Sequence, residues 1–521
     1  MHLESTRRAF RAARLLAPLA AGLLALPAAA DDIGWAELIA RLGGTGVPTG
    51  AGVPVGQVEP LVGSGLYGPD FTNAAEYGDV TFMQQSGAAG LSWHANAVAY
   101  SYYGNLSSIA PGITLVYLWE ANNFATTGYL KTGSAVSVLP PVAPGGLRIF
   151  NNSWIGTFGS ASLDNDANRR ADFAMNRDDT LFTTGLNNGA GAVPSLLNYQ
   201  YNGLSVGRMD GDHSWGVVPA GYDGPGRMKP EIVAPGSATS WSTPVVSSVA
   251  SLLYETAITP PLSGNVNARR NCTIKSVMMC GANHRPGWSN GAPTSGPTRG
   301  ITAKPLDPVY GADLVNVNNA HWILTAGEQE GQTAVPPVAT IGPRGWDLRT
   351  VPGNTTFYYR FRITQPVATV SILAASNRIF GTAIGAGSVA NFNLTLYRAD
   401  GTTLMPLTGD GGLPWFSSGN VVSQSAVDNV EHLFVRDLQP GDYVVELKRV
   451  DSVTTQVPVC LSWFMPETPQ MVGDLNGDLH VNGADLGLLI GNWGGSGVGD
   501  INGSGLVDGA DLGLLIGGWT G

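Results

Sequence analysis

The chain has 521 residues, of which 43% are hydrophobic and 13% charged, and its formal net charge is -11. This length is enough for several domains, and the apolar share is enough for a sizeable core. The acidic balance without any basic stripe argues against a nucleic-acid partner, and the 70 glycines favour a loop-rich, β-containing extracellular protein over a helical bundle.

The first thirty residues have the features of an export signal. A basic start holds Arg7, Arg8, Arg11 and Arg14, and the apolar run over 15–26 is too short to span a bilayer comfortably. Because residues 28–30 offer an alanine cleavage site, we predict a signal peptide over 1–30, cleavage after Ala30 and a secreted, extracytoplasmic protein. A membrane anchor is the alternative, and the paired arginines leave both Sec and twin-arginine export open. No later segment is long and apolar enough to cross a membrane.

Residues 31–330 alternate short β-like runs with helical ones. The predicted strands cover 52–59, 115–120 and 148–154, and the predicted helices cover 93–102, 164–176 and 242–256. This alternation predicts an α/β domain with a parallel sheet, whose active-site groups lie at strand ends and helix starts. Residues 331–337 are predicted to be a linker.

A serine stands where the last of these helices opens. Residues 229–246 read KPEIVAPGSATSWSTPVV, an extended run that ends in Pro235-Gly236 and is followed by Ser240 and an apolar helical stretch. Unpaired N–H groups and the helix dipole favour negative charge at a helix start, which suits a hydroxyl nucleophile beside an oxyanion site. The alternative is a capping serine on an ordinary core helix.

The string over 229–246 resembles the nucleophile segment of subtilisin-like serine peptidases. Other segments resemble that family in the same order over about residues 50 to 325. The resemblance implies that His94, in Trp93-His94-Ala-Asn-Ala-Val, is the base. It implies that Ser153 and Trp154 line the substrate cleft and that Asn187, with Asn188 as the fallback, donates its amide to the oxyanion.

The position of the acid departs from the family pattern. Glu59 stands where the family has Asp, and its extra methylene moves the carboxylate by roughly one C–C bond. Misplacement of a catalytic group by about 1 Å can cost about a hundredfold in rate. Asp70 and Asp79 are alternative acids, and His213 is an alternative base. Ala95 and Ala238 replace two glycines of the family pattern, and their methyl groups are expected to narrow the cleft or to shift the serine.

These residues together imply a secreted serine endopeptidase that hydrolyses protein or peptide substrates through Ser240, His94 and Glu59, without a cofactor for catalysis. The alternative is a catalytically weak or inactive binding or scaffold protein of the same fold, attached to a complex through its C-terminal module.

Residues 335–468 have an all-β pattern. Alternating runs at 356–364, 369–373, 391–397, 431–435 and 443–448 predict about eight short strands in a β-sandwich. The segment loosely resembles the sandwiches that follow the catalytic domain in many secreted peptidases. A spacer role and the binding of carbohydrate or substrate both stay open.

Residues 472–521 contain a duplicated oxygen-rich loop, with copies starting at 474 and 500 and Leu-Gly-Leu-Leu-Ile-Gly after each. Ca²⁺ ligands at loop positions 1, 3, 5, 7, 9 and 12 would be Asp474, Asn476, Asp478, the His480 carbonyl, Asn482 and Asp485, then Asp500, Asn502, Ser504, the Leu506 carbonyl, Asp508 and Asp511. A loop followed by an exit helix, twice, resembles the type I dockerin, a small α-helical calcium-binding module. The resemblance implies a cohesin-type partner, and a structural calcium tail without one is the alternative.

The chain has three cysteines, Cys272, Cys280 and Cys460. On a helix, the first two would be about 12 Å apart along the axis, too far for a disulfide. We predict buried thiols, and a bond from either one to Cys460 is the alternative.

Overall fold

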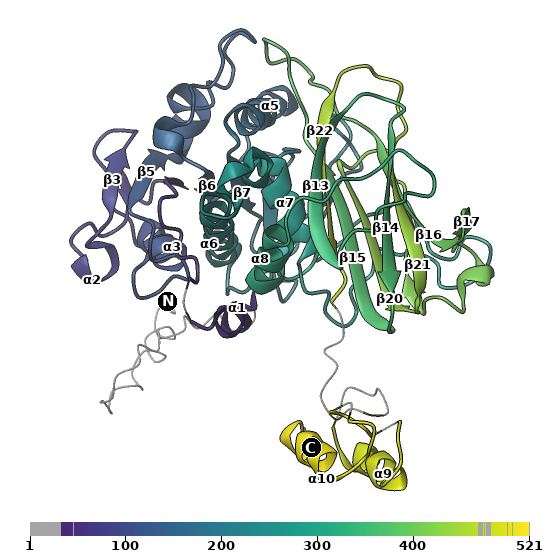
Figure 1. Cartoon of the computed structure of the whole chain (residues 1–521). Coiled ribbons are helices and arrows are strands. Elements are labelled where there is room, and N and C mark those ends of the chain that lie inside the picture. The colour runs from purple at the N-terminus through teal and green to yellow at the C-terminus, as the bar shows by residue number, and fades with distance from the viewer. Residues whose placement is uncertain are drawn as a thin grey trace.

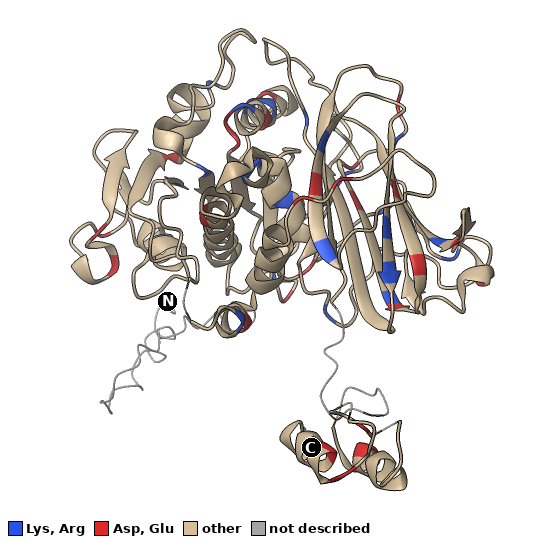
Figure 2. Ribbon diagram, in the orientation of Figure 1, with Lys and Arg blue, Asp and Glu red and all other residues tan. Residues whose placement is uncertain are grey.

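The computed structural model describes residues 33–44, 46–466, 473, 475, 481–497, 499–502 and 504–519. The predicted signal peptide over 1–30 lies outside these residues. An α/β domain leads into a β-sandwich, and two short helices end the described chain (Figure 1). Across the described ranges, no helix is both long and apolar enough to cross a membrane. In the view of Figure 2, charged residues lie scattered over both large domains as single positions and small groups.

The α/β domain is built on a seven-stranded parallel sheet in the order β11-β8-β7-β6-β1-β5-β3. The strands are β1 (Val55–Glu59), β3 (Thr81–Gln84), β5 (Leu115–Glu120), β6 (Ile149–Asn152), β7 (Leu181–Gly185), β8 (Leu204–Arg208) and β11 (Ile232–Ala234). From β1 the chain first fills one side of the sheet and then crosses to the other. The strand order therefore reverses at β1, which opens a crevice at the carboxyl ends of the strands.

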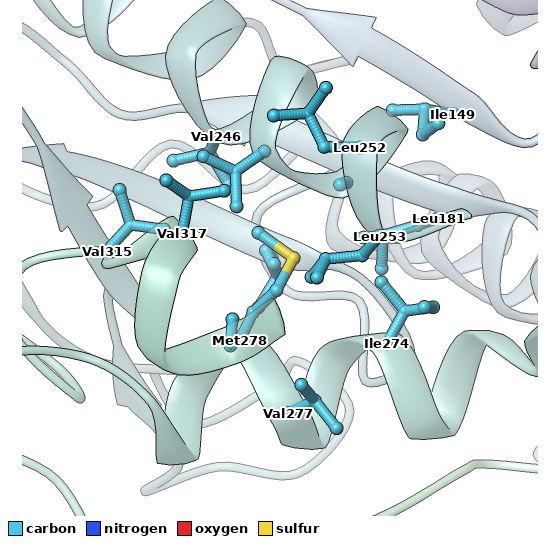
Figure 3. Close-up of a cluster of buried hydrophobic side chains, with 14 of the residues drawn as sticks. Ile149, Leu181, Val246, Leu252, Leu253, Ile274, Val277, Met278, Val315 and Val317 are labelled. Carbon is cyan, nitrogen blue, oxygen red and sulfur yellow. The ribbon is translucent and has the colours of Figure 1, made fainter. Parts of the chain in front are cut away.

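Both faces of this sheet are covered, because successive strand residues point to opposite faces. Ile149 and Leu181 pack toward α6 (Thr239–Ile258) and α7 (Asn271–Cys280), as Figure 3 shows. Phe150 and Phe182 pack instead in the cluster that contains residues of α5 (Ala161–Asp178). The predicted parallel α/β architecture is thus present, with its longest helix starting at Thr239 rather than at 242.

Smaller elements complete the α/β domain. They are α1 (Trp35–Leu42), α2 (Ala74–Tyr77), α3 (Trp93–Tyr103), α4 (Ala121–Asn123), α8 (Val317–Thr325), and the two-stranded sheets β2 (Leu66–Gly68) with β4 (Gly90–Leu91) and β9 (Gly216–Val217) with β10 (Met228–Lys229).

The sandwich consists of two sheets. One holds β12 (Ile301–Thr302), β19 (Val422–Ser423), β16 (Phe392–Asp400), β21 (Gly441–Arg449) and β14 (Thr356–Ile363), with β17 (Thr403–Pro406) on β16. The other holds β13 (Arg344–Val351), β22 (Val457–Phe464), β15 (Val367–Ser376), β20 (Val430–Leu438) and β18 (Ser418–Gly419). Strand β12 comes from the 31–330 segment, so the α/β segment contributes one strand to the sandwich.

The five-stranded sheet of the sandwich packs against the α/β domain through its central strands. Every residue of β22 is buried, and Trp346 and Phe464 join the core of the α/β domain while Trp463 faces the inside of the sandwich. Ser276 on α7 donates a hydrogen bond to the Leu373 carbonyl over 3.1 Å. The sandwich is therefore docked onto the α/β domain.

The same interface contains the three cysteines, and all of them are free and buried, as predicted. The Cys272 thiol lies 3.0 Å from the Ala375 carbonyl of β15. Burial raises the pKa of the Cys272 thiol to about 12. The segment predicted as a linker is also engaged, because Gln332 exchanges backbone hydrogen bonds with Tyr358 of β14.

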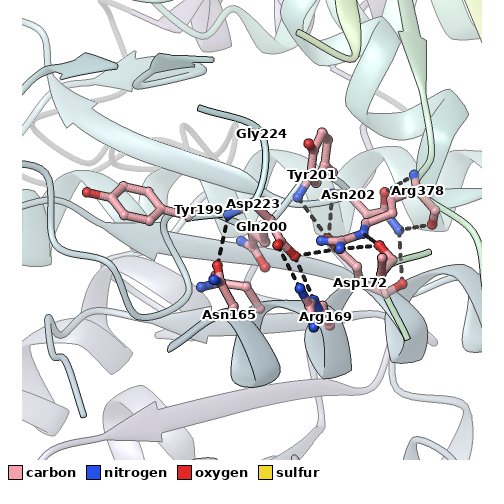
Figure 4. Close-up of polar contacts among 12 residues, drawn as sticks. Asn165, Arg169, Asp172, Tyr199, Gln200, Tyr201, Asn202, Asp223, Gly224 and Arg378 are labelled. Atoms are coloured by element: carbon pink, nitrogen blue, oxygen red, sulfur yellow. Dashed lines mark hydrogen bonds and ion pairs between the residues drawn. The ribbon is translucent and has the colours of Figure 1, made fainter. Parts of the chain in front are cut away.

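A polar seam joins the two domains beside this apolar contact (Figure 4). Arg378, which follows β15, pairs with Asp223 at 2.5 Å, and Arg169 of α5 grips the same carboxylate with two bonds of 2.7 Å. Asp172, also on α5, accepts the backbone N–H groups of Tyr201 and Asn202. These contacts fix how the two domains are aligned along the seam, because each charged group has a partner from another segment.

Two helices, α9 (Gly483–Gly491) and α10 (Gly509–Gly517), follow the two C-terminal loops. Each begins with a capping box, formed by Asn482 with Asp485 in the first and by Asp508 with Asp511 in the second. A small separate core fills the space between them, made of Val481, Leu489, Val507 and Leu515.

Candidate active site

The residues predicted for catalysis lie where strands end and helices begin, around the crevice beside β1. Glu59 is the last residue of β1, and His94 and Ser240 are the second residues of α3 and α6. A cavity of about 260 Å³ opens among them. Its lining residues are Pro60, His94, Ser153, Trp154, Ile155, Leu186, Asn187, Asn188, Thr239 and Ser240.

Glu59 and His94 are in direct contact. The Glu59 Oε2 to His94 Nδ1 distance is 2.6 Å, with the glutamate side chain fully buried and the histidine side chain 12% exposed. Because a carboxylate only accepts, Nδ1 carries the proton, and Nε2 is left as the basic nitrogen. Burial lowers the pKa of His94, but the hydrogen bond and negative charge of Glu59 outweigh it and raise the pKa above its usual value.

The imidazole of His94 is also held by its surroundings. Ser92 caps α3 by accepting the Ala95 N–H over 3.1 Å, which sets the start of the helix. The indole rings of Trp93 and Trp241 flank the imidazole, with centroids 5.5 and 5.3 Å away. The ring is therefore oriented from three sides.

Ser240 occupies the first turn of α6. Its Oγ donates to the Ser153 carbonyl over 3.3 Å, and not to His94. The residue ahead of the helix, Ala238, has extended backbone angles (φ −151°, ψ 155°), so its methyl group causes no backbone strain.

The two asparagines after β7 have different roles. Asn188 Oδ1 accepts from Thr239 N–H over 2.8 Å and from Thr239 Oγ over 3.1 Å, which directs its amide to the start of α6 and leaves Nδ2 as a donor. Asn187 is tied through its backbone to Ser214. The geometry thus favours Asn188, the sequence alternative, over Asn187 as the side-chain donor beside Ser240.

The competing residues do not join the site. His213 is buried, and both its ring nitrogens are used, one by the Arg208 N–H at 3.1 Å and the other by the Val309 carbonyl at 2.9 Å. The Asp70 carboxylate accepts from Thr72, and Asp79 is exposed. Glu59 is thus the carboxylate that contacts His94.

Sequence reasoning missed two buried polar residues behind Glu59. Gln57 Nε2 donates to Glu59 Oε1 over 2.9 Å and to the Ala95 carbonyl over 2.8 Å, and the Tyr103 hydroxyl donates to Gln57 Oε1. A glutamine two residues before the acid on a strand shares its face. The two-residue spacing between Gln57 and Glu59 on a predicted strand is therefore a sequence signal for this contact.

In the second C-terminal loop, the carboxylates fold back on the loop's own backbone. Asp500 accepts from Ser504 N–H over 2.9 Å and Gly505 N–H over 2.7 Å, and Asp511 accepts from Ile501 and Asn502. The side chains at the predicted ligand positions of this loop offer oxygen atoms, the ligand type that Ca²⁺ prefers. Within the described residues, no three His, Cys, Asp or Glu side chains converge as a metal cluster. Four first-loop ligands, Asp474, Asn476, Asp478 and His480, lie outside the described residues.

No protein-family model and no curated protein matches the chain. Among solved structures, it is similar to the prenylagaramide maturation protease PagA (16% identity, 55% of this chain and 98% of that one, TM-score 0.36). It is also similar to the patellamide maturation protease PatA (18%, 53% and 98%, 0.35) and to a protease from Pseudoalteromonas arctica (14%, 56% and 94%, 0.32). Because these TM-scores are below 0.5, we draw nothing further from the likeness.

Proposed function

We propose that the chain is a secreted serine endopeptidase, and the contact between Glu59 and His94 at 2.6 Å beside Ser240 is the observation that carries this proposal. Ser240 Oγ attacks the peptide carbonyl while His94 Nε2 takes its proton. His94 then gives that proton to the leaving amine, and water repeats the sequence to release the acyl group. Glu59 holds the tautomer of His94 and stabilises the imidazolium.

The negative oxygen of the tetrahedral intermediate would be held by two donors. One is the Ser240 N–H, which belongs to the first turn of α6 and has no acceptor inside the helix. The other is Asn188 Nδ2, whose partner oxygen is anchored on Thr239. Helix α6 fixes the first donor and the contact with Thr239 fixes the second, as preorganised stabilisation requires.

The lining of the cavity supports an uncharged, apolar substrate residue. Its walls include Pro60, Trp154, Ile155 and Leu186, and His94 is the one titratable side chain among the lining residues. Ser153, predicted as a substrate contact, supplies the backbone carbonyl that Ser240 now occupies. A substrate strand that bonds to this carbonyl would release the Ser240 hydroxyl for His94.

A fluorophosphonate probe tests the proposal, because it labels a serine only when a neighbouring base activates it. We expect the full chain to label and Ser240→Ala and His94→Ala to lose the label. Ser237→Ala, an exposed serine three residues upstream, is the matched control that keeps it. Failure of the folded parent protein to label would refute catalysis.

That failure would favour the second candidate, a binding or scaffold protein with little or no turnover. The observation in its favour is that Ser240 donates to Ser153 and not to His94. Catalytic hydrogen bonds are often long or misaligned without substrate, however, so the enzyme is the better supported function.

We further propose that the C-terminal repeats bind Ca²⁺ and dock a protein partner of the cohesin type that the sequence resemblance implies. Asp500, Asn502, Ser504, Asp508 and Asp511 would hold the ion in the second loop, and its binding would order a module whose own core is very small. Support for docking comes from duplicated exposed apolar side chains: Leu488, Ile490 and Trp493 on one repeat and Leu514, Ile516 and Trp519 on the other.

Calcium titration followed by tryptophan fluorescence tests this proposal, because Trp493 and Trp519 are about half exposed at 49% and 44%. We expect a chelator-reversible change that Asp511→Asn weakens. If the full chain shows no calcium response, the proposed calcium binding is refuted. A calcium response without binding of a cohesin-type partner would support a structural calcium tail.

A further inference from the structure

We infer that Gln57 and Tyr103 are positioning residues that allow a glutamate to serve as the acid of the site, an inference that rests on the proposed peptidase function. The four residues Tyr103, Gln57, Glu59 and His94 form one hydrogen-bonded series, here called the acid-holding network. Its first three side chains have exposures of 0%.

The two oxygens of Glu59 are divided between two partners. Oε2 accepts from His94 Nδ1 and Oε1 accepts from Gln57 Nε2 over 2.9 Å. A glutamate side chain has one more rotatable bond than an aspartate, so it needs a second fixed contact to hold a single carboxylate position. Gln57 supplies that contact from the same strand and the same face of β1.

The orientation of the Gln57 amide is itself determined. Its Nε2 faces two acceptors, the Glu59 carboxylate and the Ala95 carbonyl at 2.8 Å, and its Oε1 faces the Tyr103 hydroxyl. Burial raises the pKa of Tyr103 well above its usual value, so this hydroxyl keeps its proton and donates. A flipped amide would place oxygen against two oxygens and nitrogen against the hydroxyl proton, which all three contacts disfavour.

The network also connects the acid to the helix that carries the base. Ala95 follows His94, and Tyr103 is the last residue of the same helix, α3. Gln57 therefore ties β1 to both ends of α3, and the Glu59–His94 distance depends on these two contacts. The Ala95 carbonyl is part of this arrangement, so the alanine after the histidine has a structural partner that the sequence did not reveal.

The test reads the protonation of His94 without turnover. Full-length Ser240→Ala protein, labelled with ¹⁵N-histidine, is titrated by NMR, and His94→Gln assigns the signal among the seven histidines. We expect the His94 pKa to lie above 6.5 and to fall below it in Gln57→Met, because burial is then no longer offset by a well-placed carboxylate. Tyr103→Phe, which removes a single oxygen, should shift it in the same direction.

Tyr102→Phe is the matched control. Tyr102 is the neighbouring residue on α3 with the same exposure of 0%, and its hydroxyl makes no hydrogen bond to the network. Gln57→Met and Tyr103→Phe should lower the melting temperature somewhat, because each removes buried hydrogen bonds, and only these two should move the His94 pKa. If Gln57→Met does not fold, the His94 pKa in Tyr103→Phe alone tests the inference.

With Ser240 restored, the rate of fluorophosphonate labelling should fall about ten- to a hundredfold in Gln57→Met, as expected for misplacement of a catalytic group by about 1 Å. An unchanged His94 pKa in both folded variants would overturn the inference while leaving a labelling parent enzyme intact. A shifted pKa in a protein that never labels would instead support the network and refute the peptidase.

Discussion

Shortening the acid to the aspartate of the resembled family should damage this site. In Glu59→Asp the carboxylate retreats by about 1.5 Å, one C–C bond. Added to the 2.6 Å separation from His94 Nδ1, this gives up to about 4.1 Å, beyond hydrogen-bond distance. The carboxylate also withdraws from Gln57, whose Nε2 lies 2.9 Å from the longer side chain.

The expected loss follows from the contact that is broken. A hydrogen bond to a charged group contributes about 1.5–3 kcal/mol, which corresponds to roughly a 10- to 150-fold slower reaction if it is lost from the transition state. The assay is the second-order rate of fluorophosphonate labelling, together with kcat/KM on a peptide with an apolar residue before the scissile bond. Glu59→Gln keeps the length and removes the charge, and it should lose more activity because its amide can donate to Nδ1 and impose the wrong tautomer. Labelling of Glu59→Asp at the parent rate or faster would refute the geometric reasoning.

Three further outcomes can be measured. The acid limb of the pH profile of kcat/KM should have its midpoint above pH 6.5, because His94 must be neutral to act as a base and its pKa is raised; a midpoint below 6.5 would contradict the contact with Glu59. Arg378→Met should lower the free energy of unfolding by about 3 kcal/mol in urea, since it removes the buried cation that faces Asp172 and pairs with Asp223 across the domain seam, whereas the exposed Arg362→Met should change it little. His432 is buried as the neutral form and its pKa is lowered to about 3, so stability should fall as pH drops from 6.5 toward 3 by up to about 1.4 kcal/mol per pH unit; His432→Gln should flatten this slope, and an equally steep slope in that variant would exclude the residue as its source.

Much of the architecture follows from local sequence patterns. The predicted strand over 115–120 coincides with β5, and the predicted helix over 93–102 differs from α3 by one residue. Such elements depend on the alternation of apolar residues and on helix starts, which neighbouring residues set. Ser240, His94 and Glu59 could be selected for the same reason, because each stands at the end of a strand or the start of a helix.

Contacts between distant segments could not be obtained in this way. The choice between Asn187 and Asn188 depends on Thr239, some fifty positions away, since only the asparagine amide that reaches the start of α6 is anchored there. The docking of the sandwich depends on β22, which is buried on one face by the core of the sandwich and on the other by helix α7 of the α/β domain.

The sequence by itself therefore determined the parallel α/β domain, the β-rich second domain and the residues that could form the site, whereas it left a disulfide to Cys460 open, which the structure excludes for the described cysteines. Only the tertiary structure decided that Glu59 reaches His94 and that Gln57 and Tyr103 hold it there. The physical reason is that the position of a residue at the end of a strand or the start of a helix is set by its neighbours in the sequence. Its hydrogen-bond geometry, by contrast, depends on how β1 and α3 pack against each other, to within a fraction of an ångström.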